Sequence, residues 1–269
     1  MTPREAIKQI TTRLLPVSNE AETEARIMLG EATGLDRARI FLSEKELDAD
    51  ALSAVEEMIK RRLSGEPLQY ILGRWSFMGL EFNVSPAALI PRQDTETLCE
   101  EALSLIKERG YKTLLDICTG TGCVAVSLNK LSGIRTEASD ISPACVRLAR
   151  ENALKNGAEV TVREADLFFG ASRYDIVTAN PPYINDEDMA HLPEEVKREP
   201  ALALAGGRDG LDLYSRIAAD AAEHILPGGA LVMEVGMGEA DAVRALFPGR
   251  ETRTVKDLNG IERVVSIGF

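Results

Sequence analysis

The sequence predicts an α/β protein with a mostly parallel sheet of seven strands, preceded by a small helical domain that a β-hairpin joins to it. Three observations predict this class. Strand-like and helix-like segments alternate from Lys112 onward, the order that builds a parallel sheet with helices on both faces. Residues 1–72 show only helical periodicity. The segment DICTGTGC follows the first strand of the alternating part and opens a helix, as glycine-rich turns of nucleotide-binding sheets do.

The N-terminal domain, residues 1–72, is expected to hold three helices. The stretch Thr2-Pro-Arg-Glu5 has the spacing of a capping box, with proline at the first helical position. The expected helices are one that carries Ala6, Ile7, Ile10 and Leu14 on one face, one from near Asn19 to Gly34, and one that follows Asp48 or Asp50 and ends at Gly65. No residue here points to chemistry, so this domain is expected to pack or to recognise a partner.

Residues 73–90 are expected to form a β-hairpin that links the two domains. Apolar residues alternate after the turn signal Met78-Gly79. The remaining residues, 91–269, are then expected to form the second domain. Asp94 is the expected N-cap of its first helix.

The second domain supplies the strands and helices of the sheet. Strands are expected at TLLDIC, RTEASD, EVTVREAD, YDIVTAN and ALVMEVG, and at residues 251–256 and 261–267. Helices are expected after Gly122, from Ser142-Pro143 to Gly157, and from about Gly210 to Ile225. The turn Asp257-Leu-Asn-Gly260 is a hairpin signal between the last two strands, so the sheet is expected to end antiparallel.

Composition restricts the classes of function. The net charge of −12 argues against a protein that grips nucleic acid through phosphates, and neither domain is basic. Four cysteines suggest no disulfide framework, and their spacing with only two histidines does not suggest zinc. No apolar run has the length of a bilayer span, and the first residues lack the apolar core of a signal peptide. We therefore expect a cytoplasmic protein with no metal, no membrane association and no direct nucleic-acid binding.

An adenosine-type ligand is predicted at the glycine-rich turn. Gly120 and Gly122 permit a tight turn and close approach of the backbone to a ligand at the start of a helix. Asp140 ends the second strand, eighteen residues after Gly122. A carboxylate at that place can accept hydrogen bonds from both ribose hydroxyls. The pattern as far as Ala125 also satisfies the dinucleotide fingerprint, so NAD and S-adenosylmethionine are both candidates.

Three features favour S-adenosylmethionine over NAD. Asp116, just before the glycines, would repel a pyrophosphate but suits the amino-acid end of S-adenosylmethionine. Asp166, after the third strand, is placed to accept from the adenine amino group, and Leu167 to pack on the ring. The closing antiparallel hairpin is also unlike the wholly parallel nucleotide fold. Either aspartate taken alone is as consistent with a turn or cap residue, so the prediction depends on the joint pattern.

The segment ANPPYIN, residues 179–185, ends the fourth strand, where parallel sheets bind ligands. The Asn180 side-chain oxygen and the Pro181 carbonyl are two acceptors that match the two hydrogens of a planar NH2 group. Tyr183 can lie against that group and exclude water. An amide nitrogen is a poor nucleophile, and acceptors on both hydrogens raise its electron density as a cation develops. Asn180, Pro181 and Tyr183 are therefore the predicted catalytic residues, with no metal and no covalent intermediate.

At these residues the chain resembles a known family. The order DICTGTG, ASDIS, ADLF and NPPYI resembles the Rossmann-like class I S-adenosylmethionine-dependent methyltransferases, and NPPY is typical of their amide- or amine-methylating branch. The segments GEPLQYILGRWSFMGLEFNVSPAALIPRQDTETL, residues 65–98, and REPALALAGGRDGLDLY, residues 198–214, resemble the peptide chain release factor glutamine methyltransferases, the HemK/PrmC family. The resemblance covers nearly the whole chain.

The resemblance implies transfer of a methyl group from S-adenosyl-L-methionine to N5 of the glutamine in the Gly-Gly-Gln loop of bacterial release factors, leaving S-adenosyl-L-homocysteine. It implies that the N-terminal domain recognises the release factor. Asn180 and Pro181 would hold the glutamine amide, and Pro182 and Tyr183 would shape its slot. The cofactor residues implied are Cys118, Thr119, Gly120, Thr121, Gly122, Asp140, Leu167 and Asn180.

Two positions depart from the family pattern, and one segment has no role that the sequence explains. Cys118 stands where the family often has glycine, and its small side chain is expected to permit the turn. Gln93 stands where the family usually has proline, which weakens any assignment of Arg92 as a substrate contact. Gly206-Gly207 is the segment without an explanation.

Other functions share the NPPY pattern. Adenine has the same pair of NH2 hydrogens as glutamine, so a DNA or RNA adenine methyltransferase remains open, although the acidic balance weighs against it. A ribosomal-protein glutamine methyltransferase shares the catalytic half, and only the linker and the N-terminal domain favour release factors. A binding module without activity would be expected to have lost Asn180 or the glycine turn, and both are intact.

Overall fold

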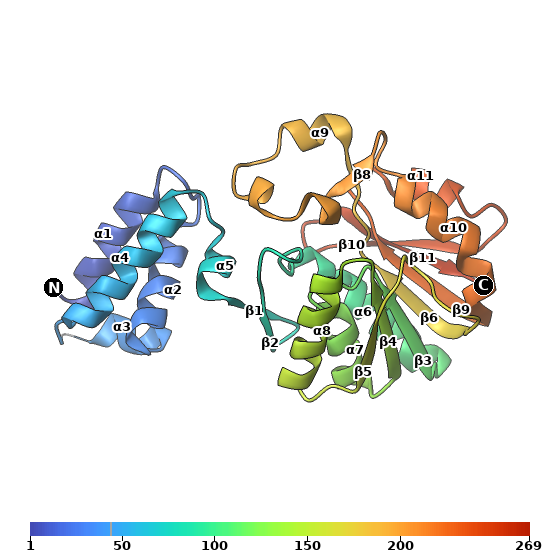
Figure 1. The fold of residues 1–269 in the computed structure, drawn as a ribbon, viewed down its shortest axis with the longest axis horizontal. Coiled ribbons are helices and arrows are strands. Elements are labelled where there is room, and N and C mark those ends of the chain that lie inside the picture. Colours follow the sequence, from blue (N-terminus) through green and yellow to red (C-terminus); the bar gives the residue numbers. More distant parts are fainter. Residues whose placement is uncertain (44) are drawn as a thin grey trace. The chain divides into compact units, whose positions relative to one another are not determined.

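The computed structural model describes residues 1–43 and 45–269, and its contacts divide the chain into two compact units (Figure 1). The first unit holds Met1–Gly73 together with Pro193–Arg198. The second unit holds Arg74–Leu192 and Glu199–Phe269. In the described part of the chain, no helix has the length and apolar character needed to cross a bilayer.

The first unit is built from helices. They are α1 (Pro3–Leu14), α2 (Ala21–Thr33), α3 (Arg37–Leu42), α4 (Ala49–Leu63) and α5 (Leu68–Leu72). The expected capping box is present, because the Thr2 side chain accepts from the Glu5 N–H and the Glu5 carboxylate accepts from the Thr2 N–H. Gly34 adopts the left-handed conformation that ends α2, also as expected. The short helices α3 and α5 were not predicted, because one or two turns are too few to show a helical period.

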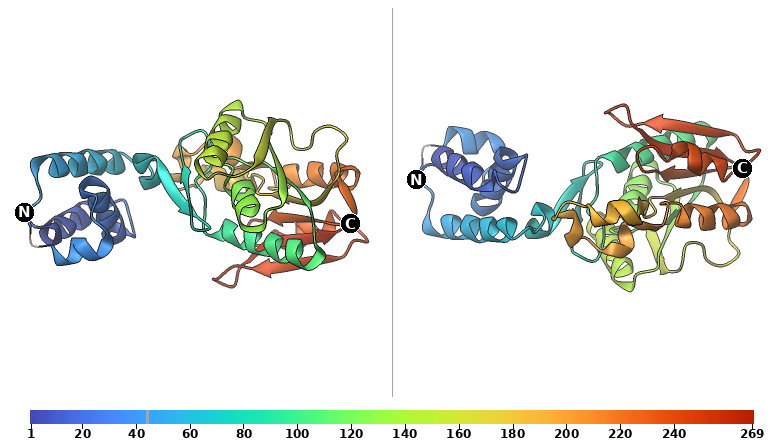
Figure 2. Two further views of the ribbon diagram at one scale, coloured as in Figure 1. Left: turned by 90° about the horizontal axis from the view of Figure 1, so that it is seen from below. Right: turned by 90° about the horizontal axis from the view of Figure 1, so that it is seen from above.

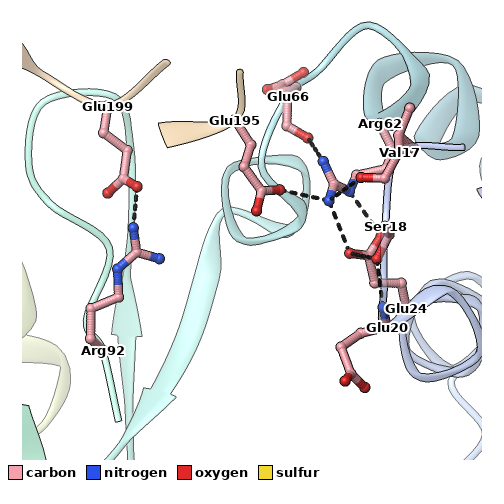
Figure 3. Close-up of polar contacts among 9 residues, drawn as sticks. All are labelled: Val17, Ser18, Glu20, Glu24, Arg62, Glu66, Arg92, Glu195 and Glu199. Atoms are coloured by element: carbon pink, nitrogen blue, oxygen red, sulfur yellow. Dashed lines mark hydrogen bonds and ion pairs between the residues drawn. The ribbon is translucent and has the colours of Figure 1, made fainter. Parts of the chain in front are cut away.

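An ionic cluster around the buried Arg62 side chain joins three segments of the first unit (Figure 3). The Arg62 Nε donates to Glu24 Oε2 at 2.8 Å, and Arg62 Nη2 donates to Glu195 Oε2 at 2.6 Å. The Ser18 hydroxyl also donates to Glu24, at 2.8 Å. Since a buried charge is tolerated only when it is paired and hydrogen-bonded, this cluster holds α4 to α2 and to the segment Pro193–Arg198.

The predicted hairpin opens the second unit. It consists of β1 (Arg74–Phe77) and β2 (Leu80–Asn83), and its turn residues Met78 and Gly79 both have positive φ. The Met78 N–H donates to the Glu96 carboxylate at 2.7 Å, which ties the turn to α6 (Asp94–Arg109). The N-cap of α6 is Gln93, so the prediction of Asp94 was wrong by one residue. Gln93 has φ of −63°, the angle that proline would impose, so either residue fits there.

Seven strands form the main sheet of the second unit, in the order β10-β11-β9-β6-β3-β4-β5. Their bounds are β3 (Thr113–Ile117), β4 (Arg135–Asp140), β5 (Val160–Glu164), β6 (Tyr174–Ala179), β9 (Ile225–Glu234), β10 (Thr252–Lys256) and β11 (Glu262–Gly268). The pairs among β5, β4, β3, β6 and β9 are parallel, and β11 pairs antiparallel with both β9 and β10. The predicted fold class is confirmed, including the antiparallel hairpin at the edge that Figure 2 shows.

Helices cover both faces of this sheet, as the alternation of side chains along β3 requires. Leu115 and Ile117 face the core formed with α10 (Asp212–His224) and α11 (Ala240–Ala245). Leu114 faces the opposite core, which α6 and α7 (Cys123–Ser132) complete. Because successive strand residues point to opposite faces, one continuous apolar strand serves two cores.

The segment between β6 and α10 contains elements that were not predicted. They are β7 (Ile184–Asn185), α9 (Asp186–Ala190), two short 3-10 helices (Val196–Arg198 and Ala201–Ala203) and β8 (Ala205–Gly207). β7 and β8 pair in parallel as a separate small sheet directly after the NPPY segment. The helix α8 (Pro143–Lys155), by contrast, begins as predicted, with Ser142 as its N-cap.

Candidate active site

A pocket opens in the second unit at the carboxyl ends of β3, β4 and β6. Most of the predicted site residues line it: Asp116, Cys118, Thr119, Gly120, Thr121, Asp140, Asp166, Leu167, Asn180 and Pro182. Gly122, Pro181 and Tyr183 do not line it. This is the end of the sheet at which open parallel folds bind ligands, because the loops there meet where the strand order reverses.

The glycine-rich turn owes its shape to three residues with positive φ. These are Cys118 (φ 55°), Gly120 (φ 55°) and Gly122 (φ 79°). A left-handed conformation is strained for a residue with a Cβ, so Cys118 carries a backbone strain that glycine would not have at this position. A Cβ on Gly122 would lie 3.0 Å from the Ala149 Cβ, so this glycine lets α7 start close against α8.

Asp116 is a buried acid in the pocket wall. Its two oxygens accept from the hydroxyls of Thr178, at 2.7 Å, and Thr119, at 2.5 Å. Burial raises the pKa of the Asp116 carboxyl to about 6, against the opposing effect of both hydrogen bonds. A cation bound in the pocket would favour the ionised form of this group.

Asp140, at the end of β4, stabilises the glycine-rich turn through hydrogen bonds. Its carboxylate accepts from the Gly120 N–H at 2.8 Å and from the Ser142 N–H at 2.9 Å. Burial raises the pKa of the Asp140 carboxyl, and these two hydrogen bonds oppose the shift. Each carboxylate oxygen has a further lone pair, so Asp140 can hold the turn and accept from a ligand at the same time.

Asp166 and Leu167 form the wall beside β5. Asp166 is half exposed and accepts from Arg216 at 2.8 Å, and Arg216 itself lines the pocket. Leu167 is buried with a φ of 67°, and its carbonyl accepts from the Ser139 hydroxyl at 2.6 Å. The strained backbone at Leu167 is thus held by a buried hydrogen bond.

The NPPY residues divide between the pocket and the core. Asn180 and Pro182 line the pocket, whereas Pro181 is buried and Tyr183 is partly buried against the core of α10 and α11. Burial raises the pKa of the Tyr183 phenol, so this side chain stays neutral at physiological pH. The Asn180 Nδ2 donates to the Thr95 hydroxyl oxygen at 3.3 Å.

Three glycines after β7 account for the Gly206-Gly207 segment, whose role could not be explained from sequence. A Cβ on Gly206 would lie 2.7 Å from the Tyr183 Cα, and a Cβ on Gly210 would lie 2.4 Å from the Tyr183 carbonyl oxygen. A Cβ on Gly207 would meet the Asp212 carboxylate. Since real Cβ atoms do not approach so closely, only glycine lets β8 and its turn lie against the backbone of the NPPY segment.

The segment between the hairpin and α6, together with the first turn of α6, supplies a wall of the pocket that was not predicted. The added lining residues there are Ala87, Ala88, Leu89, Ile90, Pro91, Arg92 and Thr95. Glu199, whose side chain is buried, accepts from the Ile90 N–H at 3.0 Å and from Arg92, the pair drawn in Figure 3. Glu199 lies in the segment 198–214 and Arg92 in the segment 65–98, both of which resemble the family. This resemblance was the one feature of the sequence that could have linked them.

The pocket fits a ligand with a cationic end. Two buried carboxylates, Asp116 and Asp140, face an otherwise largely apolar lining, and an ionised acid gains most from a cation where water is excluded. In the described part of the chain, no three His, Cys, Asp or Glu side chains are grouped as metal ligands.

The sheet order and the site at its carboxyl end define a class I methyltransferase fold. The fold is shared with a methyltransferase from Pyrococcus furiosus, at a TM-score of 0.54 and 16% identity, over 80% of this chain and 98% of that one. The model of the methyltransferase small domain matches residues 97–199, and that of the PrmC N-terminal domain matches residues 5–73.

Proteins with similar sequences identify the family of this chain. The release factor glutamine methyltransferase of Geobacter sulfurreducens is 42% identical over 253 residues, 91% of this chain and 88% of that protein. The release factor glutamine methyltransferase of Moorella thermoacetica is 40% identical, over 98% of this chain and 97% of that protein. The chain belongs to the release factor glutamine methyltransferase family, and it is an enzyme.

Proposed function

We propose that this enzyme transfers a methyl group from S-adenosyl-L-methionine to the side-chain amide nitrogen of the glutamine in the Gly-Gly-Gln motif of bacterial peptide chain release factors. The observation that carries the proposal is Asn180 at the wall of the pocket, followed by two prolines, in a chain that matches release factor glutamine methyltransferases over nearly its whole length. Release factors are accordingly the proposed partners, and S-adenosyl-L-homocysteine is the proposed product.

The pocket residues divide into cofactor and substrate contacts. Asp116 would face the amino-acid end of the cofactor, Asp140 the ribose, and Asp166 with Leu167 the adenine. The backbone of the turn from Cys118 to Thr121 would approach the cofactor closely. When bound, the cofactor supplies an electrophilic methyl group on a sulfonium. Gly122, which packs on Ala149 instead of lining the pocket, is proposed to shape the turn without contact.

The chain's own contribution to the reaction is to hold and polarise the acceptor amide. The Asn180 Oδ1 and the Pro181 carbonyl would each accept one amide hydrogen, which keeps the nitrogen rich in electrons while it becomes bonded to carbon. Pro182 and Tyr183 would shape the slot for the planar group. Because two adjacent prolines fix φ and donate no backbone hydrogen bonds, the backbone at these acceptors is rigid and its prolines offer no competing N–H.

The first unit is proposed to recognise the release factor. Its helices supply none of the residues that line the pocket, and the PrmC N-terminal domain model matches it over residues 5–73. A recognition role would explain why a separate helical unit accompanies a pocket that is complete without it.

Intact-peptide mass analysis tests the function. The protein is incubated with S-adenosylmethionine and, in separate reactions, a bacterial release factor, a ribosomal protein fraction and duplex DNA. One added methyl group on the glutamine of Gly-Gly-Gln is the expected result. A release factor in which that glutamine is replaced by alanine is the matched control and should stay unmodified. Methylation of a ribosomal glutamine or of adenine, with none on the release factor, would overturn the assignment of substrate.

A further inference from the structure

The Asn180 side chain has two chemically different ends, and only one of them suits the proposed reaction. Its Oδ1 accepts hydrogen bonds, whereas its Nδ2 donates them. An acceptor facing the substrate amide requires that Nδ2 point elsewhere. In the structure, Nδ2 points to the Thr95 hydroxyl oxygen, 3.3 Å away.

The Thr95 hydroxyl is itself oriented by Glu234. Burial raises the pKa of the Glu234 carboxyl to about 7, and a hydrogen bond with the Thr95 side chain opposes that shift, so the Thr95 hydroxyl lies within reach of this carboxyl. In its ionised form the carboxylate can only accept a hydrogen bond. When Glu234 is ionised, the single hydroxyl hydrogen of Thr95 points to the carboxylate, and Thr95 can offer only lone pairs to Asn180. A flipped Asn180 would put its own oxygen against those lone pairs, so the chain from Glu234 through Thr95 selects one orientation of the amide.

The fold brings these three residues together from distant segments. Ala179 pairs with Met233 in the parallel ladder of β6 and β9, so Asn180 and Glu234 are the next residues along neighbouring strands. Thr95 lies in the first turn of α6. Thr95 is 3% exposed and Glu234 is 2% exposed, so water does not compete for these hydrogen bonds.

Burying the Glu234 carboxyl lowers the stability of the fold, so a purely structural role does not explain this residue. An acid at this depth is destabilising unless its oxygens are hydrogen-bonded, and its Oε2 has no hydrogen-bond partner among the described residues. Arg263, whose charge lowers the pKa of Glu234, is itself paired with Asp94 and Asp257 at 3.3 Å. An apolar side chain would pack at the end of β9 without this cost, which points to a function for the acid.

We propose that Thr95 and Glu234 are positioning residues that hold the Asn180 amide with its oxygen toward the acceptor nitrogen. The inference rests on the proposed function, because it assumes that Asn180 accepts from the substrate. It assigns a role to the threonine in the first turn of α6 and to the acid at the end of β9, neither of which touches the reacting atoms.

Three variants test the inference by methyl transfer to a release factor. Thr95→Val keeps the shape of the side chain but removes the hydroxyl, and it should lower kcat about tenfold or more while the KM for the release factor changes less. Thr95→Ser keeps the hydroxyl and should retain most of the turnover. Glu234→Leu, which removes the acceptor for the Thr95 hydroxyl, should lower kcat as Thr95→Val does.

A double-mutant cycle separates positioning from a direct role, since Thr95 also lines the pocket. If Thr95 acts through Asn180, then Thr95→Val should have no further effect on kcat in an Asn180→Ala background. Equal effects of Thr95→Val in both backgrounds would overturn the inference, and so would a wild-type kcat in Thr95→Val. Thermal unfolding of each variant checks that the loss is not one of folded protein. A wild-type enzyme that leaves the release factor unmodified would instead contradict the proposed function.

Discussion

Arg62 and Glu195 lie 133 residues apart in the sequence, yet Arg62 Nη2 is 2.6 Å from Glu195 Oε2 in the first unit (Figure 3). The Arg198 guanidinium reinforces this contact by donating to the Ser64 carbonyl at 3.0 Å. Residues 193–198 therefore pack with α4, although the chain before and after them belongs to the second unit. The very next residue, Glu199, holds the Ile90 and Arg92 wall of the pocket.

Glu24 and Glu195 both form ion pairs with Arg62, but replacing them should affect stability to different extents. The Glu24 side chain is 11% exposed and the Glu195 side chain 47% exposed, so water screens only the second ion pair well. Glu24→Gln should lower the free energy of unfolding by about 3 kcal/mol, because it breaks a buried charge pair. Glu195→Gln should lower it by less than about 1 kcal/mol. Urea unfolding measures both, and equal effects would contradict the assigned difference in burial.

Gly206→Ala should destabilise the support of the NPPY segment. Its new Cβ would have to displace the Tyr183 backbone, at a cost of about 1–3 kcal/mol in the free energy of unfolding, and it should lower turnover as the segment moves. Gly268→Ala is the matched control, because the nearest atoms to its Cβ lie 3.9 Å away and its φ is not in the left-handed region. Urea unfolding and initial rates check both variants. Wild-type stability and turnover in Gly206→Ala would show that Tyr183 does not need this close contact.

Asn180→Ala should lower turnover about 10²-fold or more, because it removes an acceptor that acts mainly in the transition state. The exposed amide of Asn259, in the turn between β10 and β11, gives the control variant Asn259→Ala, which should leave turnover unchanged. The measurement is the initial rate of methyl transfer at saturating substrates. Turnover near the wild-type value in Asn180→Ala would remove Asn180 from the reaction.

Binding of S-adenosylmethionine should depend on pH through Asp116. The pKa of this carboxyl is about 6, so it is increasingly protonated below pH 6. A cationic ligand favours the ionised form, so binding releases a proton and affinity should fall as pH drops from 7 to 5. Calorimetry at several pH values should show this loss in the wild type. The Asp116→Asn variant should bind S-adenosylmethionine more weakly, and its affinity should not fall between pH 7 and 5. If its affinity falls as in the wild type, another group causes the pH dependence.

The raised pKa of Asp116 also predicts how the free energy of unfolding changes with pH. The native state holds the Asp116 proton more tightly than the unfolded chain, in which the ordinary pKa is 3.8. Between pH 3.8 and about 6 the native state therefore binds more protons, and this group lowers stability as the pH rises. The difference in free energy of unfolding between Asp116→Asn and the wild type should grow over that range and stay constant above it.

Much of the fold and of the site could be read from local sequence. The capping box at Thr2, the stop at Gly34 and the hairpin turn at Met78-Gly79 each specify backbone conformation over a few residues. Strands and helices long enough to show a period were found, whereas α3, α9 and β7 have too few residues to show one. The boundary at Gln93 was missed by one residue because the N-cap there makes no side-chain hydrogen bond, whereas the next residue, Asp94, is of a type that usually caps.

The sequence by itself determined the type of each long element, the parallel class of the sheet with its antiparallel end, and the residues of the glycine turn and NPPY segment. Tertiary structure alone decided which residues complete the site: Thr95 beside Asn180, Glu199 beneath Ile90, and Gly206 behind Tyr183. It also decided that residues 193–198 pack with α4. The physical reason is that backbone conformation follows from neighbours three or four residues away, whereas these contacts join residues that are 20 to 110 or more apart. No periodic pattern in the chain encodes such a pairing.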